Sequence, residues 1–374
     1  MPNDGVWIFV DDRREEARAF AAEFERSGQI KIEVLSPTEA RQQLLLARRK
    51  PAGVLMDVDL SSIADELGTG PGIAQDIRTK QKAGLAQEFP IVRFSAAEPV
   101  HRNVLGDPSS DDLFELKILK NEVRHKRDQI VLHLLGLTEV YEALDKLEAS
   151  PGGWSAELDA IFGIDAVKFS GWGHEGLVAK VLAGAMHSSH VAANAFCRLF
   201  LIPSGLLIDE KLLALRLGVD VEKSGAAWAT LLGKLGDAKY GGVARTRFER
   251  WWARGLEEWW FKNIDSITPL ASRTVAERVD LLANRTTTPG LEPLAGSAPS
   301  SEFRPWRFCR LGLESEPAEF LPVDPTDSVR LTPQADFPAW IDPPVASLRL
   351  ALRARNDARL NQKDLERMRR KHRA

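Results

Sequence analysis

The sequence predicts an α/β domain built on a doubly wound parallel sheet, followed by a mainly α-helical region. Through the first 122 residues, short apolar runs alternate with segments of helical periodicity, the pattern of a parallel sheet covered by helices on both faces. After the Ser-Pro-Gly-Gly stretch at 150–153 the strand signals stop and apolar residues recur with helical spacing. A chain of 374 residues has room for two or three such domains.

The N-terminal region contains five strand signals and the helices between them. The expected strands are 6–12, 30–36, 52–60, 90–96 and 112–120. The expected helices are 14–28, 37–49, 71–81 and 121–148. The last of these either runs through or breaks at Gly136. Residues 99–110 are rich in Pro, Asn, Gly and Ser, so any helix there should be short or irregular.

Composition divides the chain into five segments. They are the α/β domain at 1–122, a linker helix at 123–149, a helical domain at 150–285, an extended Pro/Gly-rich arm at 286–344 and a basic C-terminal helix at 345–374. The helical domain should contain helices at 174–200, 207–218, 225–236 and 243–264. The arm is expected either to dock through its isolated aromatic side chains or to be a disordered linker. The last segment carries ten Lys and Arg against three Asp and Glu.

Polar side chains follow four of the predicted strands. Asp11 and Asp12 end the first strand, Asp57 the third and Ser95 the fourth, while Lys117 follows the weaker apolar run at 112–116. The carboxyl ends of strands in an open parallel sheet meet at one edge, where ligands bind. We therefore expect these five side chains to form one site.

These residue types together suit phosphoryl transfer to a carboxylate. Asp11 and Asp12 would bind Mg²⁺, a hard cation that prefers oxygen ligands, and Mg²⁺ would neutralise the repulsion between attacking carboxylate and phosphoryl group. Asp57 would be the nucleophile. Ser95 and Lys117 would each bind one phosphoryl oxygen. Taken singly, a strand-end Asp is often only a turn or a helix N-cap; the coincidence of all four positions favours the functional interpretation.

At these residues the chain resembles the receiver domain of two-component response regulators, over about residues 5–122. The resemblance implies a flavodoxin-like fold, with Asp57 as the phospho-acceptor and Mg²⁺ as the cofactor. It places the family's switch aromatic, three residues before the lysine, on Phe114, and it implies that Asp59 offers its backbone carbonyl to the metal. Two departures stand out: Ile118 follows Lys117 where the family has proline, and residues 61–66 lengthen the loop after Asp57.

Composition excludes some classes of protein. The formal net charge of −3 gives no overall attraction to nucleic acid. The two cysteines, Cys197 and Cys309, and the lack of a charged-then-apolar leader predict a reducing, cytoplasmic location. No apolar run approaches the ~18 residues expected of a membrane-spanning helix.

The segment 244–263 contains two tryptophan pairs among several arginines. A buried helix with a tryptophan-rich seam is one interpretation, and stacking on nucleic-acid bases is another. We also consider an exposed surface for a protein partner, because Trp and Arg are common at interface hot spots. The candidate partner surface consists of Arg247, Trp251, Arg254 and Trp259.

No catalytic motif emerges in the C-terminal half. His174, His187, His190 and Cys197 lie within 24 residues, but their spacing matches no closed zinc motif and favours helix packing. The glycine-rich stretch at 171–177 lacks a nucleotide-binding pattern. Whether the chain is an enzyme beyond its phospho-acceptor chemistry is left open.

The predicted function is that of a response-regulator-like signalling protein. Asp57 would receive a phosphoryl group from a histidine kinase or phosphotransfer protein, and this would switch a helical output domain that binds a protein partner; homodimerisation through the receiver is a further expectation. One alternative is a DNA-binding transcriptional regulator that uses the arginine-rich helix or the basic tail, a less favoured interpretation. Others are a receiver-controlled enzyme with a site around His174 and Glu175, and a degenerate receiver with a structural role.

Overall fold

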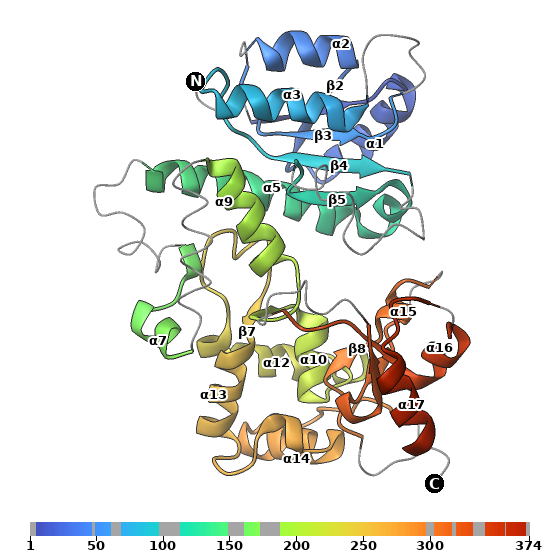
Figure 1. Cartoon of the computed structure of the whole chain (residues 1–374). Helices are drawn as coiled ribbons and strands as arrows, with labels where there is room; N and C mark the ends of the chain where they lie inside the picture. Colours follow the sequence, from blue (N-terminus) through green and yellow to red (C-terminus); the bar gives the residue numbers. More distant parts are fainter. Residues whose placement is uncertain are drawn as a thin grey trace. The chain divides into compact units, whose positions relative to one another are not determined.

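The computed structural model consists of two compact units (Figure 1). It describes residues 5–46, 49–60, 69–96, 113–148, 161–172, 188–296, 303–315, 319–331, 341–355 and 357–371. Unit 1 comprises Met1–Leu201 and Gly241–Phe248, and unit 2 comprises Ile202–Tyr240 and Glu249–Ala374. Unit 1 thus extends past the boundaries expected at 122 and 149, and unit 2 continues past the one expected at 285. The segment 241–248, which was expected in the helical domain, belongs to unit 1.

Unit 1 contains a five-stranded parallel sheet with the order β2-β1-β3-β4-β5. The strands are β1 (Val6–Val10), β2 (Lys31–Leu35), β3 (Gly53–Asp57), β4 (Ile91–Ser95) and β5 (Leu116–Leu119). This order is that of the flavodoxin-like doubly wound fold, in which ligands bind outside the carboxyl ends of the strands. The expected fold class is confirmed.

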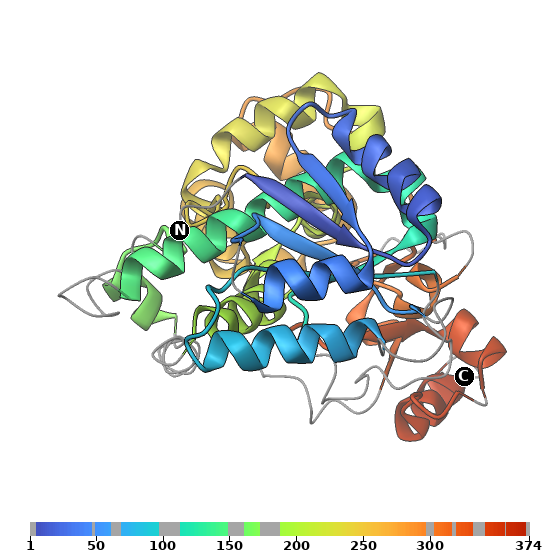
Figure 2. The same ribbon diagram turned by 90° about the horizontal axis from the view of Figure 1, so that it is seen from above.

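Helices cover both faces of this sheet. The elements concerned are α1 (Arg14–Glu25), α2 (Pro37–Ala40), the π-helical turn η1 (Arg41–Leu45), α3 (Gly70–Lys82) and α5 (Val123–Glu148). Figure 2 shows α3 on one side of the strands and α5 on the other. Successive side chains of β1 point to opposite faces of the sheet. Ile8 and Val10 lie in the core cluster shared with α3, while Phe9 packs edge to face on Phe94.

Local sequence sets the helix ends. Ser36 and Glu39 form a capping box at α2, Thr69 accepts a hydrogen bond at the start of α3, and Gly28 follows α1 with φ at +65°. Helices α2 and α3 therefore begin at, or one residue from, the starts expected at 37 and 71.

The helix expected to link the domains is part of unit 1. Helix α5 packs against α1 and β5, and its Val131, Leu134 and Leu137 are completely buried. The backbone kinks at Lys126 and continues through Gly136. At Gly136 an added Cβ would lie 2.5 Å from the ring of Phe248, so glycine permits the segment 241–248 to approach α5.

The amino ends of β4 and β5 carry a buried ion pair. Glu115, directly before β5, accepts hydrogen bonds from Arg78 of α3 (2.9 Å), Tyr141 of α5 (2.7 Å) and the ring Nδ1 of His190 (2.6 Å). Burial raises the pKa of Glu115, but Arg78 and the other two donors outweigh it and hold the pKa below its usual value. The carboxylate is thus fully compensated.

His190 belongs to α9 (Ser189–Phe196), which continues into the π-helical turn η4 (Cys197–Leu201). The start of α9 is fastened to the sheet unit, since Glu88 accepts hydrogen bonds from the Ser188 hydroxyl and the His190 N–H, both at 2.6 Å. Asn194 donates to the carbonyl of Phe114 at 3.0 Å. The expected helical domain began at residue 150, and before α9 its described residues contain α7 (Ala166–Gly171).

Unit 2 is mainly helical but contains short antiparallel strand pairs that the sequence did not predict. Its first part has β6 (Leu207–Ile208), α10 (Glu210–Leu217), α11 (Val221–Ser224), α12 (Ala226–Lys234), the 3₁₀ turn η5 (Gly236–Ala238), β7 (Trp251–Trp252), α13 (Ala253–Asn263), the 3₁₀ turn η6 (Leu270–Ser272) and α14 (Val275–Arg285). One core cluster joins these elements, with Trp228, Trp251, Trp259 and Trp260 among its members.

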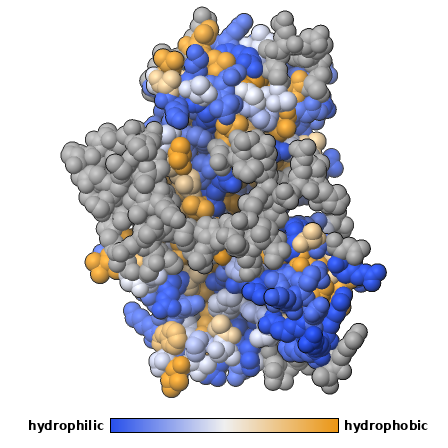
Figure 3. Space-filling model, in the orientation of Figure 1, coloured by the Kyte–Doolittle hydropathy of each residue, from blue (hydrophilic) through white to orange (hydrophobic). Residues whose placement is uncertain are grey.

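The expected arm is in part folded. Its described residues form β8 (Arg307–Phe308), α15 (Arg310–Leu313), β9 (Pro322–Val323), the 3₁₀ turn η7 (Pro325–Asp327) and β10 (Ser328–Arg330). With β11 (Val345–Ser347), α16 (Leu348–Arg353) and α17 (Gln362–Lys371) they build a core around Cys309, Val329, Leu365 and Met368. Figure 3 shows strongly hydrophilic side chains over the region where Figure 1 has α16 and α17.

No helix in the described ranges has both the length and the apolar character needed to span a bilayer.

Replacing Arg78 by Met should destabilise unit 1 by about 3–5 kcal/mol, because it leaves the buried Glu115 carboxylate without its cation. Chemical unfolding followed by circular dichroism measures this. The matched control is Arg26→Met, which breaks a surface pair with Glu23 in which the Arg26 side chain is 68% exposed, and it should cost at most about 1 kcal/mol. Equal losses in the two variants would contradict the role of Arg78.

Candidate functional site

Three carboxylates meet at the carboxyl edge of the sheet. Asp11 and Asp12 directly follow β1, and Asp57 ends β3. Oxygens of all three lie within 4.8 Å of one another, and the described residues contain no other group of three metal-ligating side chains. Asp11 and Asp57 are buried. The three carboxylates of the predicted site therefore do lie close together, while their role in binding a metal or a phosphoryl group stays a prediction.

Backbone contacts orient two of these carboxylates. Asp57 Oδ1 accepts the Val58 N–H at 2.7 Å, and Asp11 Oδ1 accepts the Arg13 N–H at 2.8 Å. The start of α3 closes against the same strand end: a Cβ at Gly70 would lie 1.8 Å from the Asp57 carbonyl oxygen. Only glycine fits there, so Gly70 fixes the approach of α3 to the site.

A lysine pairs with the carboxylates, and it is Lys120. Its Nζ lies 2.8 Å from Asp57 Oδ2, 3.4 Å from Asp11 Oδ2 and 3.6 Å from Glu16 Oε1. Burial disfavours the charged ammonium, but the hydrogen bond to Asp57 and the surrounding carboxylates raise the pKa of Lys120 above its usual value. The lysine therefore stays positively charged inside the site.

The choice of Lys117 from the sequence is wrong for this position. Lys117 pairs in register with Arg93 in the middle of β5, and its side chain is exposed. Ser95, the last residue of β4, is level with Leu119, so the next residue, Lys120, reaches the edge. The apolar pair Ile118-Leu119 directly before Lys120 was the sequence signal that could have indicated it.

The expectation for Phe114 rested on the spacing to Lys117 and fails with it. Phe114 lies before β5, buried in the core cluster that faces α3. The residue three positions before Lys120 is Lys117, so no aromatic side chain stands there. The residue after Lys120 is Asn121, and the proline typical of the family is absent at this position also.

Ser95 and Asp59 differ in their relation to the carboxylates. Ser95 ends β4 beside β3 and is buried, and its contact with a phosphoryl group stays a prediction. The side chain of Asp59 is 64% exposed and lies 3.8 Å from Arg13, outside the group of three. The added residues at 61–66 lie outside the described part of the chain.

The electrostatics of the group suit a bound cation. Burial, together with the neighbouring Asp57 charge, raises the pKa of Asp11 to about 7, against the lowering effects of the Arg13 N–H and Lys120. One lysine thus compensates the three carboxylates incompletely. A hard cation with oxygen ligands, such as Mg²⁺, would relieve the remaining repulsion, and the residues present fit such an ion.

The tryptophans of the candidate partner surface are buried. Trp251 is 2% exposed and Trp259 is 5% exposed, and their neighbours Trp252 and Trp260 are equally enclosed. The segment is not one helix either, since Trp251 lies in β7 and Trp259 in α13. Burial of the large indole rings in the core removes apolar surface from water. The interpretation of these tryptophans as core residues is therefore confirmed, and their interpretation as an exposed partner surface is wrong.

The two arginines of that surface also have partners within the chain. Arg247 donates to Glu139 of α5 at 2.9 Å and to Gln29 at 3.2 Å, all within unit 1. Arg254 pairs with Glu257 on the exposed side of α13 at 2.9 Å. Arg247 therefore joins two parts of unit 1, and no partner surface of these four residues exists.

The histidine and cysteine group does not form a metal site among the described residues. His190 is bonded to Glu115, and Cys197 is buried, which raises the pKa of its thiol. His174, Glu175 and His187 lie outside the described ranges.

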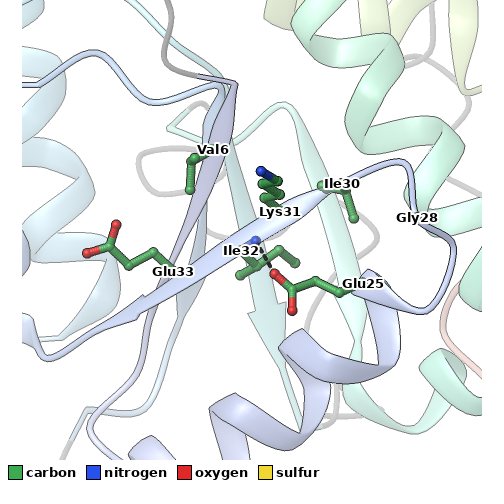
Figure 4. Close-up of a pocket in the computed structure, with 7 residues that line it drawn as sticks. All are labelled: Val6, Glu25, Gly28, Ile30, Lys31, Ile32 and Glu33. Carbon is green, nitrogen blue, oxygen red and sulfur yellow. Dashed lines mark hydrogen bonds between the residues drawn. The ribbon is translucent and has the colours of Figure 1, made fainter.

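A shallow hollow lies beside edge strand β2 (Figure 4). The residues that line it are Val6, Glu25, Gly28, Ile30, Lys31, Ile32 and Glu33. The backbone N–H of Ile32 in this hollow already donates to Glu25 of α1 at 2.8 Å. Val6 and Lys31 begin their strands, so the hollow is at the amino end of the sheet, away from the three carboxylates.

Solved structures similar to this chain include response-regulator receiver domains. The response regulator TrrA from Thermotoga maritima, solved in complex with Mg²⁺ and BeF, is 19% identical over 34% of this chain and 97% of that one, with a TM-score of 0.27. A Francisella receiver domain is 15% identical over 36% and 97%, with a TM-score of 0.27. A CheY-like receiver from Methylobacillus flagellatus is 18% identical over 33% and 96%, with a TM-score of 0.25.

No family model matches the chain, and no curated protein matches it. The structural likeness covers about the N-terminal third of the chain and concerns the fold.

Adding Mg²⁺ should raise the melting temperature, because the ion binds the folded carboxylate group and not the unfolded chain. Differential scanning fluorimetry with the Asp12→Asn variant should show a much smaller rise. Asp59→Asn is the matched control and should keep the full rise, since its side chain lies outside the group. A full rise in Asp12→Asn would place the ion elsewhere.

Asp11 should make stability depend on pH in the absence of divalent cations. Its pKa is about 7 when folded and 3.8 ordinarily, so the folded state binds the proton more tightly. The resulting stabilisation is complete below the ordinary value and is lost as the pH rises through about 7.

The wild type should therefore lose more stability than Asp11→Asn between about pH 6 and about pH 8, as measured by melting in a chelator. Parallel curves for the two proteins would show that Asp11 is ionised throughout this range.

Proposed function

We propose that unit 1 is a response-regulator receiver that accepts a phosphoryl group on Asp57 from a histidine kinase or a phosphotransfer protein. The observation that carries this proposal is the convergence of Asp11, Asp12 and Asp57 within 4.8 Å at the carboxyl edge, with Lys120 bonded to the acceptor. A purely structural carboxylate would be expected to be compensated as Glu115 is. At the carboxyl edge, in contrast, three carboxylates share one lysine, which leaves uncompensated negative charge that a cation could balance.

Each residue has a defined role in this proposal. An oxygen of Asp57 attacks phosphorus, an acyl phosphate bond forms, and the bond from phosphorus to the donor's leaving group breaks with its electron pair. Asp57 Oδ2 is the oxygen facing Lys120, while Oδ1 is occupied by the Val58 N–H. Lys120 would then pair with a phosphoryl oxygen, and the Ser95 hydroxyl would donate to another.

Mg²⁺, when bound, supplies positive charge between the acceptor and the incoming phosphoryl group. Asp11 and Asp12 would hold it with Asp57, and the backbone carbonyl of Asp59 is a further proposed ligand. Glu16, which the sequence did not indicate, lies 3.6 Å from Lys120. The Glu16 carboxylate would continue to attract the Lys120 ammonium after Asp57 is phosphorylated.

Phosphorylation of Asp57 would change the contacts that unit 1 makes with a protein effector. The protein would act in the cytoplasm as a signalling protein. Residue Asp57 gains negative charge on modification, and charge changes of this kind reorder neighbouring segments. Lys120 connects the site to α5, since η2 (Lys120–Glu122) leads directly into that helix, and α9 packs on α5. Self-association through the receiver remains a prediction.

Incubation with acetyl phosphate and Mg²⁺ should add one phosphoryl group to the full chain, detected by intact mass spectrometry. Asp57→Asn should remove this product. Loss of the cation in Lys120→Ala should slow labelling by about tenfold or more, as deletion of a charge-stabilising donor does.

Lys117→Ala is the matched control, because Lys117 is an exposed mid-strand lysine of the same chain segment, and it should label at the wild-type rate. Labelling that persists in Asp57→Asn, or none in the wild type with several small phosphodonors, would leave a degenerate receiver as the remaining interpretation.

A further inference from the structure

The C-terminal helix α17 exposes one face made of cations. Asp364, Leu365 and Met368 are buried on its inner side. On the opposite side Lys363, Arg367 and Arg370 are exposed, with the i, i+4 and i+7 spacing that places side chains in one row. At ~1.5 Å per residue the row is about 10 Å long.

Helix α16 and the turn after it add to this face. Arg353, the last residue of α16, and Arg355 in the following turn are exposed, and α16 packs against α17. The strongly hydrophilic area in Figure 3 lies over this part of unit 2. We call Arg353, Arg355, Lys363, Arg367 and Arg370 the basic surface.

Most of the basic surface is not neutralised by neighbours. Two nearby cations outside it are paired, Arg359 with Glu314 at 3.0 Å and Lys371 with Asp327 at 2.7 Å. Within it, Arg367 lies 3.6 Å from Asp364, but Asp364 is already held by Arg330 at 2.6 Å.

The remaining four, Arg353, Arg355, Lys363 and Arg370, form no ion pair with any residue in the described ranges. Glu366 is the one carboxylate on the exposed side of α17. A surface with this excess of positive charge attracts polyanions, although the chain as a whole has a net charge of −3.

We propose that the basic surface binds the phosphate backbone of a nucleic-acid duplex. A duplex presents about one negative charge per 1.7 Å of its axis, so a 10 Å row of fixed cations faces several phosphates at once. The cations are held on a helix whose inner side is anchored in a core, which reduces the entropy lost on binding. The proposal concerns unit 2 and does not depend on phosphoryl transfer to Asp57.

A lipid membrane fits the same surface less well. Helices that lie on membranes insert an apolar face between headgroups. The apolar side chains of α17, Leu365 and Met368, are enclosed in the core of this part of unit 2 and cannot insert. Pure charge attraction without insertion suits a phosphate backbone.

The test is binding of the full chain to a fluorescently labelled DNA duplex of about 25 base pairs, followed by anisotropy between about 50 and about 200 mM KCl. The wild type should bind with an affinity that falls steeply with salt. The triple variant Arg353→Gln, Lys363→Gln, Arg370→Gln should bind at least about tenfold more weakly at the low-salt end. Its log–log salt slope should be smaller by about 2.7, or about 0.9 per contact removed.

The control removes the same charge elsewhere, at exposed cations that form no ion pair in the described structure. Lys80→Gln, Lys82→Gln, Arg285→Gln should leave affinity and slope unchanged, and both triple variants should keep the wild-type melting temperature. Equal loss in the two variants, or wild-type binding by the first, would overturn the proposal. Binding to phosphatidylserine vesicles without binding to the duplex would overturn the choice of partner.

Discussion

The close approach of three carboxylates at one edge of the sheet is the constraint on which the site of unit 1 depends. Asp11, Asp12 and Asp57 repel one another, and Lys120 compensates only part of their charge. The surrounding structure holds them in place: β3 is buried along its whole length, and Gly70 closes α3 onto the end of that strand. A group of like charges can persist in a fold only when the surrounding packing supplies the free energy that the repulsion costs.

The opposite edge of the same sheet shows how a buried carboxylate is treated when it serves structure alone. Glu115 is as deeply buried as Asp11, yet Arg78, Tyr141 and His190 satisfy it and its pKa is lowered. The pKa of Asp11, in contrast, rises to about 7. The two buried acids differ in the number of donors around them, and this difference separates an internal anchor for α3, α5 and α9 from a site with unused capacity for a cation.

The interior of unit 2 contains several large tryptophan side chains. Trp259 and Trp260 bury their rings in the core cluster and donate their indole N–H groups to the carbonyls of Lys234 and Thr268. Arg278 is completely buried beside this cluster, and its guanidinium donates to the carbonyls of Leu270, Arg216 and Pro305. In the C-terminal part, α17 buries Leu365 and Met368 and exposes Lys363, Arg367 and Arg370.

The sequence by itself determined the five strands of unit 1, the helices between them and the carboxylates at the strand ends, because apolar periodicity and strand termini are local properties. It could not choose between Lys117 and Lys120, since that choice depends on the pairing of β5 with β4, which sets Leu119 level with Ser95. It also could not decide whether Trp251 and Trp259 are buried, or that 241–248 returns to unit 1 beside Gly136. Those outcomes depend on contacts between segments far apart in the chain, and only the tertiary structure brings such segments together.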